Sequence, residues 1–215
     1  MPRFRHRRDA GRRLAERLET VRGEDAVVLG IPRGGVVIAH EIATQIKAPL
    51  DVVVVRKLGF PGHEEAGFGA LGEDGVLVPE ELSRLRADDP RQAEFRSVIE
   101  VKEREVAERV ERYRRGRPPQ LLEGRTAVVA DDGVATGYTF AAALAIARRR
   151  SPTRLIAAAP AASWEGADLI STYCDELVAI GTADPGLFFA VSLYYDDFPQ
   201  VSDEEVVELL NPGAP

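Results

Sequence analysis

Short apolar runs alternate with helical patterns along most of the chain. Runs rich in Val, Leu, Ile and Ala lie at residues 26–30, 51–56, 126–130, 154–160 and 176–180. Apolar residues at helical spacing predict helices over residues 9–21, 36–46, 137–150, 164–173 and 202–210. Strands that alternate with helices favour a parallel sheet with right-handed crossovers. The pattern therefore predicts one α/β domain over residues 1–215, with a central, mostly parallel sheet flanked by helices.

Two long segments between the second and third predicted strands do not fit this alternation. Residues 57–75, within "RKLGFPGHEEAGFGALGEDG", are too rich in glycine for a helix and too long for a simple connection, so we expect a functional loop. Residues 90–115 carry Glu and Arg at i,i+4 spacing around a narrow apolar stripe. The stripe consists of Phe95, Ile99, Val106, Val110 and Tyr113. This segment predicts a long, mostly solvated helix.

Composition limits the compartment and the partners. Cys174 is the only cysteine, so neither an intramolecular disulfide nor a multi-cysteine zinc site can form, as is typical of a reducing compartment. No run approaches the roughly 18 consecutive apolar residues of a membrane span. We therefore expect a cytoplasmic protein that does not bind membranes. The net charge is -7 and only the start, "RFRHRRDAGRR", is basic, so we expect no nucleic-acid role.

Two adjacent carboxylates and a small-residue stretch stand out in "VVADDGVATGYT", residues 128–139. Asp131 and Asp132 follow the strand predicted at 126–130, and ligands of open parallel sheets bind at the carboxyl ends of strands. The following stretch enters a helix, where backbone amides and the positive end of the helix dipole favour a phosphate. Carboxylates beside a phosphate site suit the vicinal hydroxyls of a sugar phosphate. A pair that only caps the helix, or that binds magnesium, is the alternative.

A second loop, "GIPRGG" at residues 30–35, follows the first predicted strand. Gly34 and Gly35 permit unusual backbone angles and expose their amides, and Arg33 adds a positive charge. Proline-glycine turns after strands are common, so a simple turn is the alternative.

The stretch "VVADDGVATGYT" resembles the signature of type I phosphoribosyltransferases that binds 5-phosphoribosyl 1-pyrophosphate (PRPP), and "GIPRGG" resembles their pyrophosphate loop. The resemblance implies that Asp131 and Asp132 bind the ribose hydroxyls and that Ala135 to Thr139 hold the 5-phosphate. It implies substrate contacts from Gly34, Gly35, Asp131, Asp132, Gly133, Val134, Ala135, Thr136, Gly137 and Thr139.

The resemblance extends over nearly the whole chain. The segments "FRHRRDAGRRLAERL", "VLGIPRGG", "VVVVRKLG", "GALGEDG", "DDGVATG" and "DFPQVSDEEV" are similar to one subgroup of this family whose acceptor is not settled. The resemblance implies the type I phosphoribosyltransferase fold with a flexible lid loop at about 57–75. It also implies a small hood from the terminal segments, including residues 184–199, and a homodimer.

Phosphoribosyl transfer breaks the bond between ribose C1 and pyrophosphate through a positively charged, oxocarbenium-like centre. Mg²⁺ bound through PRPP, Arg33, Lys57 and the loop amides would neutralise the leaving group, with Arg56 as a further substrate contact. Glu65 in the lid is a candidate catalytic carboxylate, and Phe188 could stack on an aromatic base.

The acceptor is not identified by these residues. Ala135 stands where the hypoxanthine and guanine enzymes carry an aspartate, and Tyr194 stands where they place an acid. From the resemblance as a whole, we expect a Mg²⁺-dependent transferase that moves ribose 5-phosphate to a purine-like or pyrimidine-like base and releases pyrophosphate. The alternatives are a PRPP-binding regulatory protein without turnover and a hydrolase that uses water. Arg33, Lys57 and a full lid favour catalysis, because a sensor does not need leaving-group chemistry.

Overall fold

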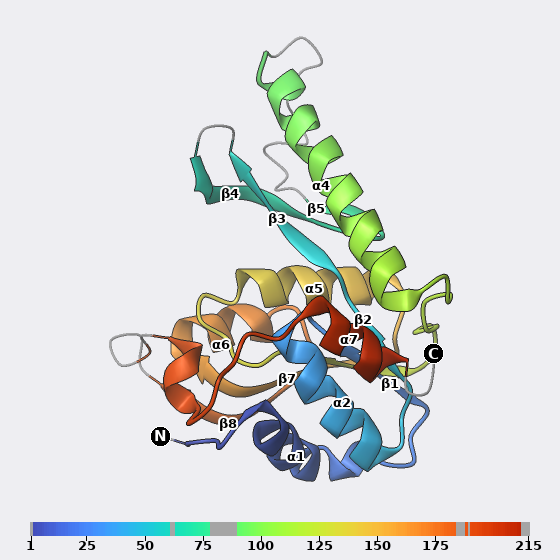
Figure 1. The fold of residues 1–215 in the computed structure, drawn as a ribbon, viewed down its shortest axis with the longest axis vertical. Coiled ribbons are helices and arrows are strands. Elements are labelled where there is room, and N and C mark those ends of the chain that lie inside the picture. Colours follow the sequence, from blue (N-terminus) through green and yellow to red (C-terminus); the bar gives the residue numbers. More distant parts are fainter. Residues whose placement is uncertain (1, 61–62, 78–89, 184–187, 189, 212–215) are drawn as a thin grey trace.

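Five parallel strands form the central sheet of the computed structural model, which describes residues 2–60, 63–77, 90–183, 188 and 190–211. Their order across the sheet is β2-β1-β6-β7-β8 (Figure 1). Their bounds are β1 (Ala26–Gly30), β2 (Leu50–Val52), β6 (Thr126–Ala130), β7 (Arg154–Ser163) and β8 (Glu176–Ala183). The predicted α/β architecture with a parallel central sheet is confirmed.

Strands β1 and β6 pair residue for residue at the centre of this sheet. Ala26 lies opposite Thr126 and Gly30 lies opposite Ala130. Because both strands run in the same direction and end at the same level, the loops that follow them leave the sheet side by side. This register places "GIPRGG" next to "ADDGVATG".

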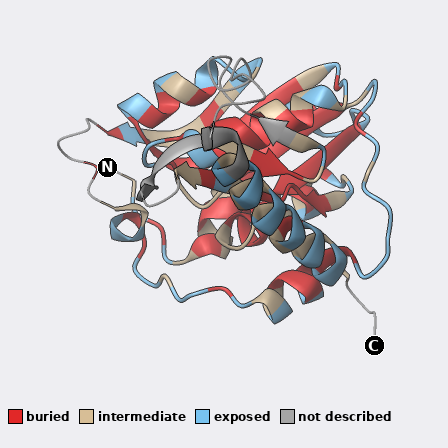
Figure 2. Ribbon diagram, turned by 90° about the horizontal axis from the view of Figure 1, so that it is seen from above, coloured by how far each residue is buried: buried red, intermediate tan, exposed pale blue. Residues whose placement is uncertain are grey.

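Helices cover both faces of the sheet, so the central strands are buried on both sides (Figure 2). Helices α1 (Arg7–Arg17) and α2 (Gly34–Ile46) pack on one face, where Leu14 and Ile38 share a core with Val28. Helices α5 (Tyr138–Arg149) and α6 (Trp164–Ser171) pack on the other face, where Leu144 shares a core with Val129. Burial on both faces explains why these strands read as continuous apolar runs.

A second, antiparallel sheet of three strands rises from the body of the domain (Figure 1). It consists of β3 (Val55–Phe60), β4 (His63–Gly72) and β5 (Gly75–Leu77), and α4 (Pro90–Arg114) packs beside it. We call these three strands and α4 the arm. Of residues 63–68, 76–77 and 90–93 the structure describes the backbone but not the side chains.

The arm differs from the sequence-based expectation at two points. The described residues between 57 and 75 are mostly strand rather than loop, and glycines lie at paired positions such as Gly59 opposite Gly67, with register irregularities on either side of Gly59. The apolar run at 51–56 was expected to be one strand, but β2 ends at Val52 and β3 begins at Val55. The buried residues Val53 and Val54 turn the chain from the central sheet into the arm.

Helix α4 confirms the long helix predicted over 90–115. Val106 and Tyr113 are buried, while Phe95, Ile99 and Val110 are partly buried against the same core. That core also includes residues of β3 and of α7 (Asp203–Leu210), for which Ser202 provides the N-cap. Most of the other described side chains of α4 are exposed, although Arg114 at its end is buried (Figure 2).

The two terminal segments meet beside the sheet. The amide of Phe4 donates to the carbonyl of Tyr194 at 2.8 Å, and the amide of Asp196 donates to the carbonyl of Phe4 at 2.8 Å. The 3-10 helix η2 (Val191–Tyr194) leads into this pairing, while residues 184–187 and 189 of the expected hood lie outside the described residues. The chain's start is therefore fixed against its tail.

A buried ionic cluster fastens the base of the arm to the body. Arg114, whose side chain is 3% exposed, donates from Nε to Asp51 Oδ1 at 2.9 Å and from Nη2 to Glu73 Oε1 at 3.0 Å. Arg150, just after α5, pairs with the same Glu73 oxygen at 2.8 Å. Glu73 is thus the carboxylate shared by two arginines from different elements.

Replacement of Glu73 by glutamine should destabilise the fold, because it leaves two largely buried guanidinium groups without their shared countercharge. We expect a loss of about 3 kcal/mol, since removal of one partner of a buried ion pair costs about 3–5 kcal/mol. Denaturant unfolding at neutral pH measures this loss. Glu123→Gln, which changes an exposed carboxylate, is the matched control. Equal stability of the two variants would contradict the role of the cluster.

Candidate functional site

A cavity of about 330 Å³ opens at the carboxyl ends of β1 and β6, between the two loops singled out above. Nine of the residues predicted to form the site line it: Arg33, Gly34, Asp131, Asp132, Gly133, Ala135, Thr136, Gly137 and Thr139. Ile31, Pro32, Phe140 and Val191 complete the lining. The register of the central sheet thus brings together loops that are about a hundred residues apart in the sequence.

The first loop carries the chain from β1 into α2. Its peptide bond between Pro32 and Arg33 is cis, and α2 begins at Gly34. A Cβ atom on Gly34 would lie 1.8 Å from Oδ2 of Asp132, and one on Gly35 would lie 2.6 Å from the carbonyl oxygen of Ala130. Only glycine fits at these positions, because the backbone of this loop packs directly against the carboxylate loop.

The second loop carries the chain from β6 into α5. Val134 is buried and pairs with β7, its amide donating to the carbonyl of Ala161 at 2.9 Å. Gly137 has a φ of 80° and packs against Gly166, where a Cβ atom would lie 2.9 Å from the carbonyl oxygen of Gly166. Ala135, Thr136 and Thr139 remain exposed. The first amides of α5 have no partner within their own helix and can therefore bind an anion.

The two carboxylates differ in their surroundings. Asp131 Oδ1 accepts a hydrogen bond from the amide of Asp132 at 2.8 Å. Asp132 Oδ2 accepts a hydrogen bond from Nε of Arg7 at 2.7 Å, and the hydroxyl of Tyr195 donates to the main-chain oxygen of Asp132 at 2.6 Å. Asp132 is therefore held at its side chain by α1 and at its main chain by the tail.

Burial raises the pKa of both carboxyl groups. For Asp131 the pKa is raised well above its ordinary value of 3.8 by burial and then by the charge of Asp132, while Arg7 opposes the shift. For Asp132 the pKa is also raised by burial, and Arg7 again opposes the shift. The ionised pair is thus costly in these surroundings, and hydroxyl donors from a ligand would relieve that cost.

A model of the family described as "Phosphoribosyl transferase domain" matches residues 5–196, which include both loops of the cavity. The chain belongs to this family. A Mycobacterium tuberculosis H37Rv protein named "Putative phosphoribosyl transferase" is 45% identical over 208 residues, which are 97% of this chain and 46% of that protein. The chain therefore spans about half the length of the curated relatives it matches.

A solved structure has the same fold over nearly its full length. The crystal structure of TT1426 from Thermus thermophilus is 41% identical in sequence, covers 97% of each chain and gives a TM-score of 0.84. The similarity extends beyond the central sheet to the arm, because only 3% of either chain is left out.

In this phosphoribosyl transferase domain, the two predicted basic residues of the arm lie apart from the cavity. Arg56 is half-buried on β3, and its Nε lies 3.4 Å from Glu105 Oε2 on α4. Lys57 is exposed on the same strand. Neither is among the residues that line the cavity within the described chain. Their contact with a substrate stays a prediction that requires the arm to approach the site.

The predicted acceptor residues are placed differently. Phe188 is buried, with its ring centroid 5.1 Å from that of Tyr194, and it packs in the core on the α1 and α2 face rather than in the cavity. The side chain of Glu65 lies outside the described residues, although its backbone belongs to β4. The described residues therefore form the donor half of the predicted site more fully than the acceptor half.

Arg7 is the site residue that the sequence did not identify. The basic start of the chain was noted, but Arg7 reaches Asp132 across 125 positions of sequence. The helix predicted from residue 9 has arginines on both sides of its start. Its pattern does not show which of them faces inward. No local spacing distinguishes the one that does.

Among the described residues no group of three or more His, Cys, Asp or Glu side chains could hold a metal ion. The donors at the cavity are two carboxylates, and one already pairs with Arg7. A magnesium ion would therefore fit only with most of its ligands supplied by an anionic substrate.

Among the residues that the structure describes, no helix is long and apolar enough to cross a membrane.

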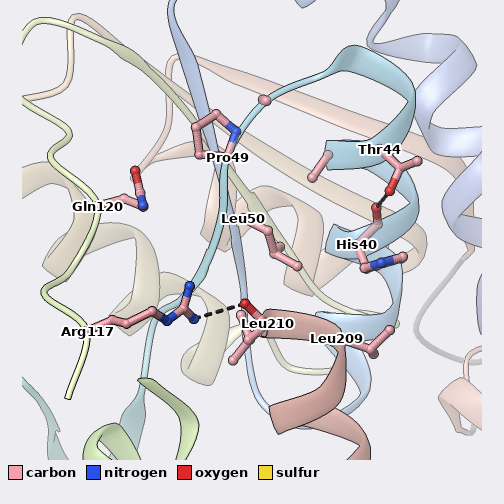
Figure 3. Close-up of a pocket in the computed structure, with 10 residues that line it drawn as sticks. His40, Thr44, Pro49, Leu50, Arg117, Gln120, Leu209 and Leu210 are labelled. Atoms are coloured by element: carbon pink, nitrogen blue, oxygen red, sulfur yellow. Dashed lines mark hydrogen bonds between the residues drawn. The ribbon is translucent and has the colours of Figure 1, made fainter. Parts of the chain in front are cut away.

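A second cavity, of about 350 Å³, lies toward the other end of α2 (Figure 3). Its walls include His40 and Thr44 of α2 on one side and Arg117 and Gln120 on the other, with Leu210 between them. No carboxylate and no glycine loop occurs among its described lining residues. The cavity with Asp131 and Asp132 is therefore the candidate active site.

Asp131→Asn should unfold at a higher temperature than the wild type at neutral pH, because the raised pKa makes ionised Asp131 costly in the folded state. The difference should shrink as the pH falls toward 3.8, where wild-type Asp131 becomes protonated in the unfolded state too. Thermal unfolding from about pH 4 to about pH 8 measures both effects.

Asp132→Asn is the matched variant for this measurement. Its gain in unfolding temperature should be smaller than that of Asp131→Asn. Arg7 already offsets the charge of Asp132, and the substitution would leave Arg7 without that charged partner. A gain from Asp132→Asn equal to or larger than that from Asp131→Asn would contradict the assignment.

Proposed function

We propose that this domain binds PRPP together with Mg²⁺ and transfers ribose 5-phosphate to a nitrogenous base, with release of pyrophosphate. The observation that carries the proposal is the convergence of two helix N-termini, at Gly34 of α2 and Tyr138 of α5, on a single cavity. Two carboxylates lie between them. Each helix start favours an anion, and the carboxylates favour hydroxyl groups, so the arrangement matches a sugar with anionic groups at both ends.

The 5-phosphate would bind at the start of α5. Thr136 and Thr139 line the cavity and can donate hydroxyl hydrogen bonds, and Gly137 allows the backbone to approach closely. Asp131 and Asp132 would accept hydrogen bonds from the ribose 2- and 3-hydroxyls. This assignment uses both exposed threonines and both partly buried carboxylates in roles that suit their surroundings.

The pyrophosphate would bind at the start of α2. Arg33 lines the cavity beside Gly34, so its charge and the first amides of the helix can face the departing oxygens. Mg²⁺ bound to PRPP would add charge neutralisation of the leaving group. Asp132 already pairs with the positive charge of Arg7. The ion would therefore be held through the oxygens of PRPP rather than by that carboxylate.

The arm would complete the site. Arg56 and Lys57 lie on β3, outside the cavity, and would add positive charge near pyrophosphate if the arm moved toward the body. Closure would also exclude water, which competes with the base for the oxocarbenium-like centre.

A PRPP-binding regulatory protein without turnover is the second candidate. The observation that favours it is the placement of Arg56 and Lys57 outside the cavity, together with the burial of Phe188 in the core. Such an arrangement would suit PRPP binding without transfer to a base. PRPP binding alone requires only the two loops.

Pyrophosphate release tests the proposal. The full chain is incubated with PRPP, Mg²⁺ and a panel of purine and pyrimidine bases, and we expect one base to raise release above the level without base. Gly34→Ala should reduce that release by about 100-fold, the order found when a preorganised anion-binding group is lost, because its Cβ would collide with Asp132. Glu123→Gln is the control and should leave release unchanged.

Calorimetric binding of PRPP separates the candidates. Binding without base-dependent release would favour the regulatory protein, and release that no base increases would indicate a hydrolase. Failure of the wild-type chain to bind PRPP would refute both the transferase and the regulator.

A further inference from the structure

Arg7 is a buried cation whose three contacts come from two distant parts of the chain, the carboxylate loop and the tail. Its Nε donates to Asp132 Oδ2 at 2.7 Å, its Nη1 donates to the carbonyl of Pro199 at 2.6 Å, and its Cζ lies 3.6 Å from the centroid of the Phe198 ring. The side chain is 9% exposed. The first helix and the tail are therefore joined to the carboxylate loop through one guanidinium group.

Three other arginines of the basic start have partners outside the site. Arg8 and Arg12 both pair with Glu41 on α2, and Arg5, just before α1, pairs with Asp9 on α1. Their side chains are between 41% and 73% exposed. Arg7 differs from them in burial and in partner, so the general basic character of the segment does not explain its position.

We propose that Arg7 is a positioning residue for the sugar-binding carboxylate: it fixes Asp132 in the one orientation that can receive a ribose hydroxyl, and it offsets one of the two negative charges that face an anionic ligand. The inference rests on the proposed function, because it takes PRPP as the ligand. It assigns to the chain's start a part of the site that lies outside both substrate loops.

The orientation argument follows from what surrounds Asp132 Oδ2. Arg7 donates to this oxygen at 2.7 Å, and the backbone of Gly34 also lies so close to it that a Cβ atom there would be 1.8 Å away. The carboxylate is therefore confined, and its other oxygen is left for a ligand. Without Arg7, the carboxylate could turn and lose the alignment with the hydroxyl.

The charge argument follows from the chemistry of the ligand. PRPP carries phosphate groups at both ends of the ribose, so two ionised, largely buried carboxylates would repel it. Arg7 at Asp132 reduces the formal charge of this group of three side chains to -1. Arg33 belongs to the other loop of the cavity, where the pyrophosphate is proposed to bind. It therefore does not replace Arg7 at the ribose.

A double-mutant cycle tests whether Arg7 acts through Asp132. PRPP binding to the full chain is measured by calorimetry for the wild type, Arg7→Met, Asp132→Asn and the double variant, with thermal unfolding of each as a check of folding. We expect Arg7→Met to weaken PRPP binding by about 10- to 100-fold, as for loss of a charge-assisted hydrogen bond. In the Asp132→Asn background the same change should have little further effect.

Inorganic pyrophosphate and two further variants separate positioning from folding. Pyrophosphate lacks the ribose, so Arg7→Met should change its affinity much less than that of PRPP. Arg7→Lys keeps the charge and should restore part of the PRPP affinity, and it replaces Arg7→Met in the cycle if the methionine variant does not fold. Arg8→Met is the control, because Glu41 keeps Arg12 as a partner, and PRPP binding should be unchanged.

Four results would overturn the inference. If Arg7→Met binds PRPP as tightly as the wild type, or loses as much affinity in the Asp132→Asn background as alone, Arg7 does not position Asp132, and the proposed function stands. Equal losses for PRPP and pyrophosphate would also refute a role at the ribose. If the wild-type chain does not bind PRPP, the inference fails together with the proposed function.

Discussion

The close contact between Gly34 and the carboxylate of Asp132 is the constraint on which the rest of the site depends. It exists because β1 and β6 pair in register and end together, so that their loops leave the sheet in contact. The same contact directs the starts of α2 and α5 toward one cavity. A side chain at Gly34 would separate the loops, and with them the two anion-binding helix ends. The central sheet thus determines the geometry of the site before any polar contact forms.

Much of the body could be predicted from the sequence, because its strands are buried on both faces. Residues 26–30 and 126–130 form continuous apolar runs, and both match the observed strands in their bounds. The site residues at the ends of these strands could be predicted for the same reason, since topology alone brings the ends of parallel neighbours together. The long helix α4 could be predicted from its i,i+4 charge pairs and its apolar stripe.

The arm and Arg7 could not be predicted, because each depends on contacts between distant residues. Glycine-rich strands such as β4 lack the β-branched pattern, and their pairing depends on a partner strand with its own irregularities. The run at 51–56 gives no local sign that the chain changes sheets after Val52. Arg7 is one of six arginines within the first 13 residues, and its partners lie at positions 132, 198 and 199. Its role depends on tertiary structure alone.

The position of Arg7 has a consequence for the order in which the site can form during synthesis. Domains generally fold as units, so a domain completes its folding only after its last segment has been made. Pro199, the acceptor of the second hydrogen bond of Arg7, is made almost 200 residues after Arg7. Strands β1 and β6 can pair before that point, whereas Arg7 cannot yet make its contacts with Phe198 and Pro199. A partly synthesised chain would hold two neighbouring carboxylates without the complete set of contacts that orients their arginine.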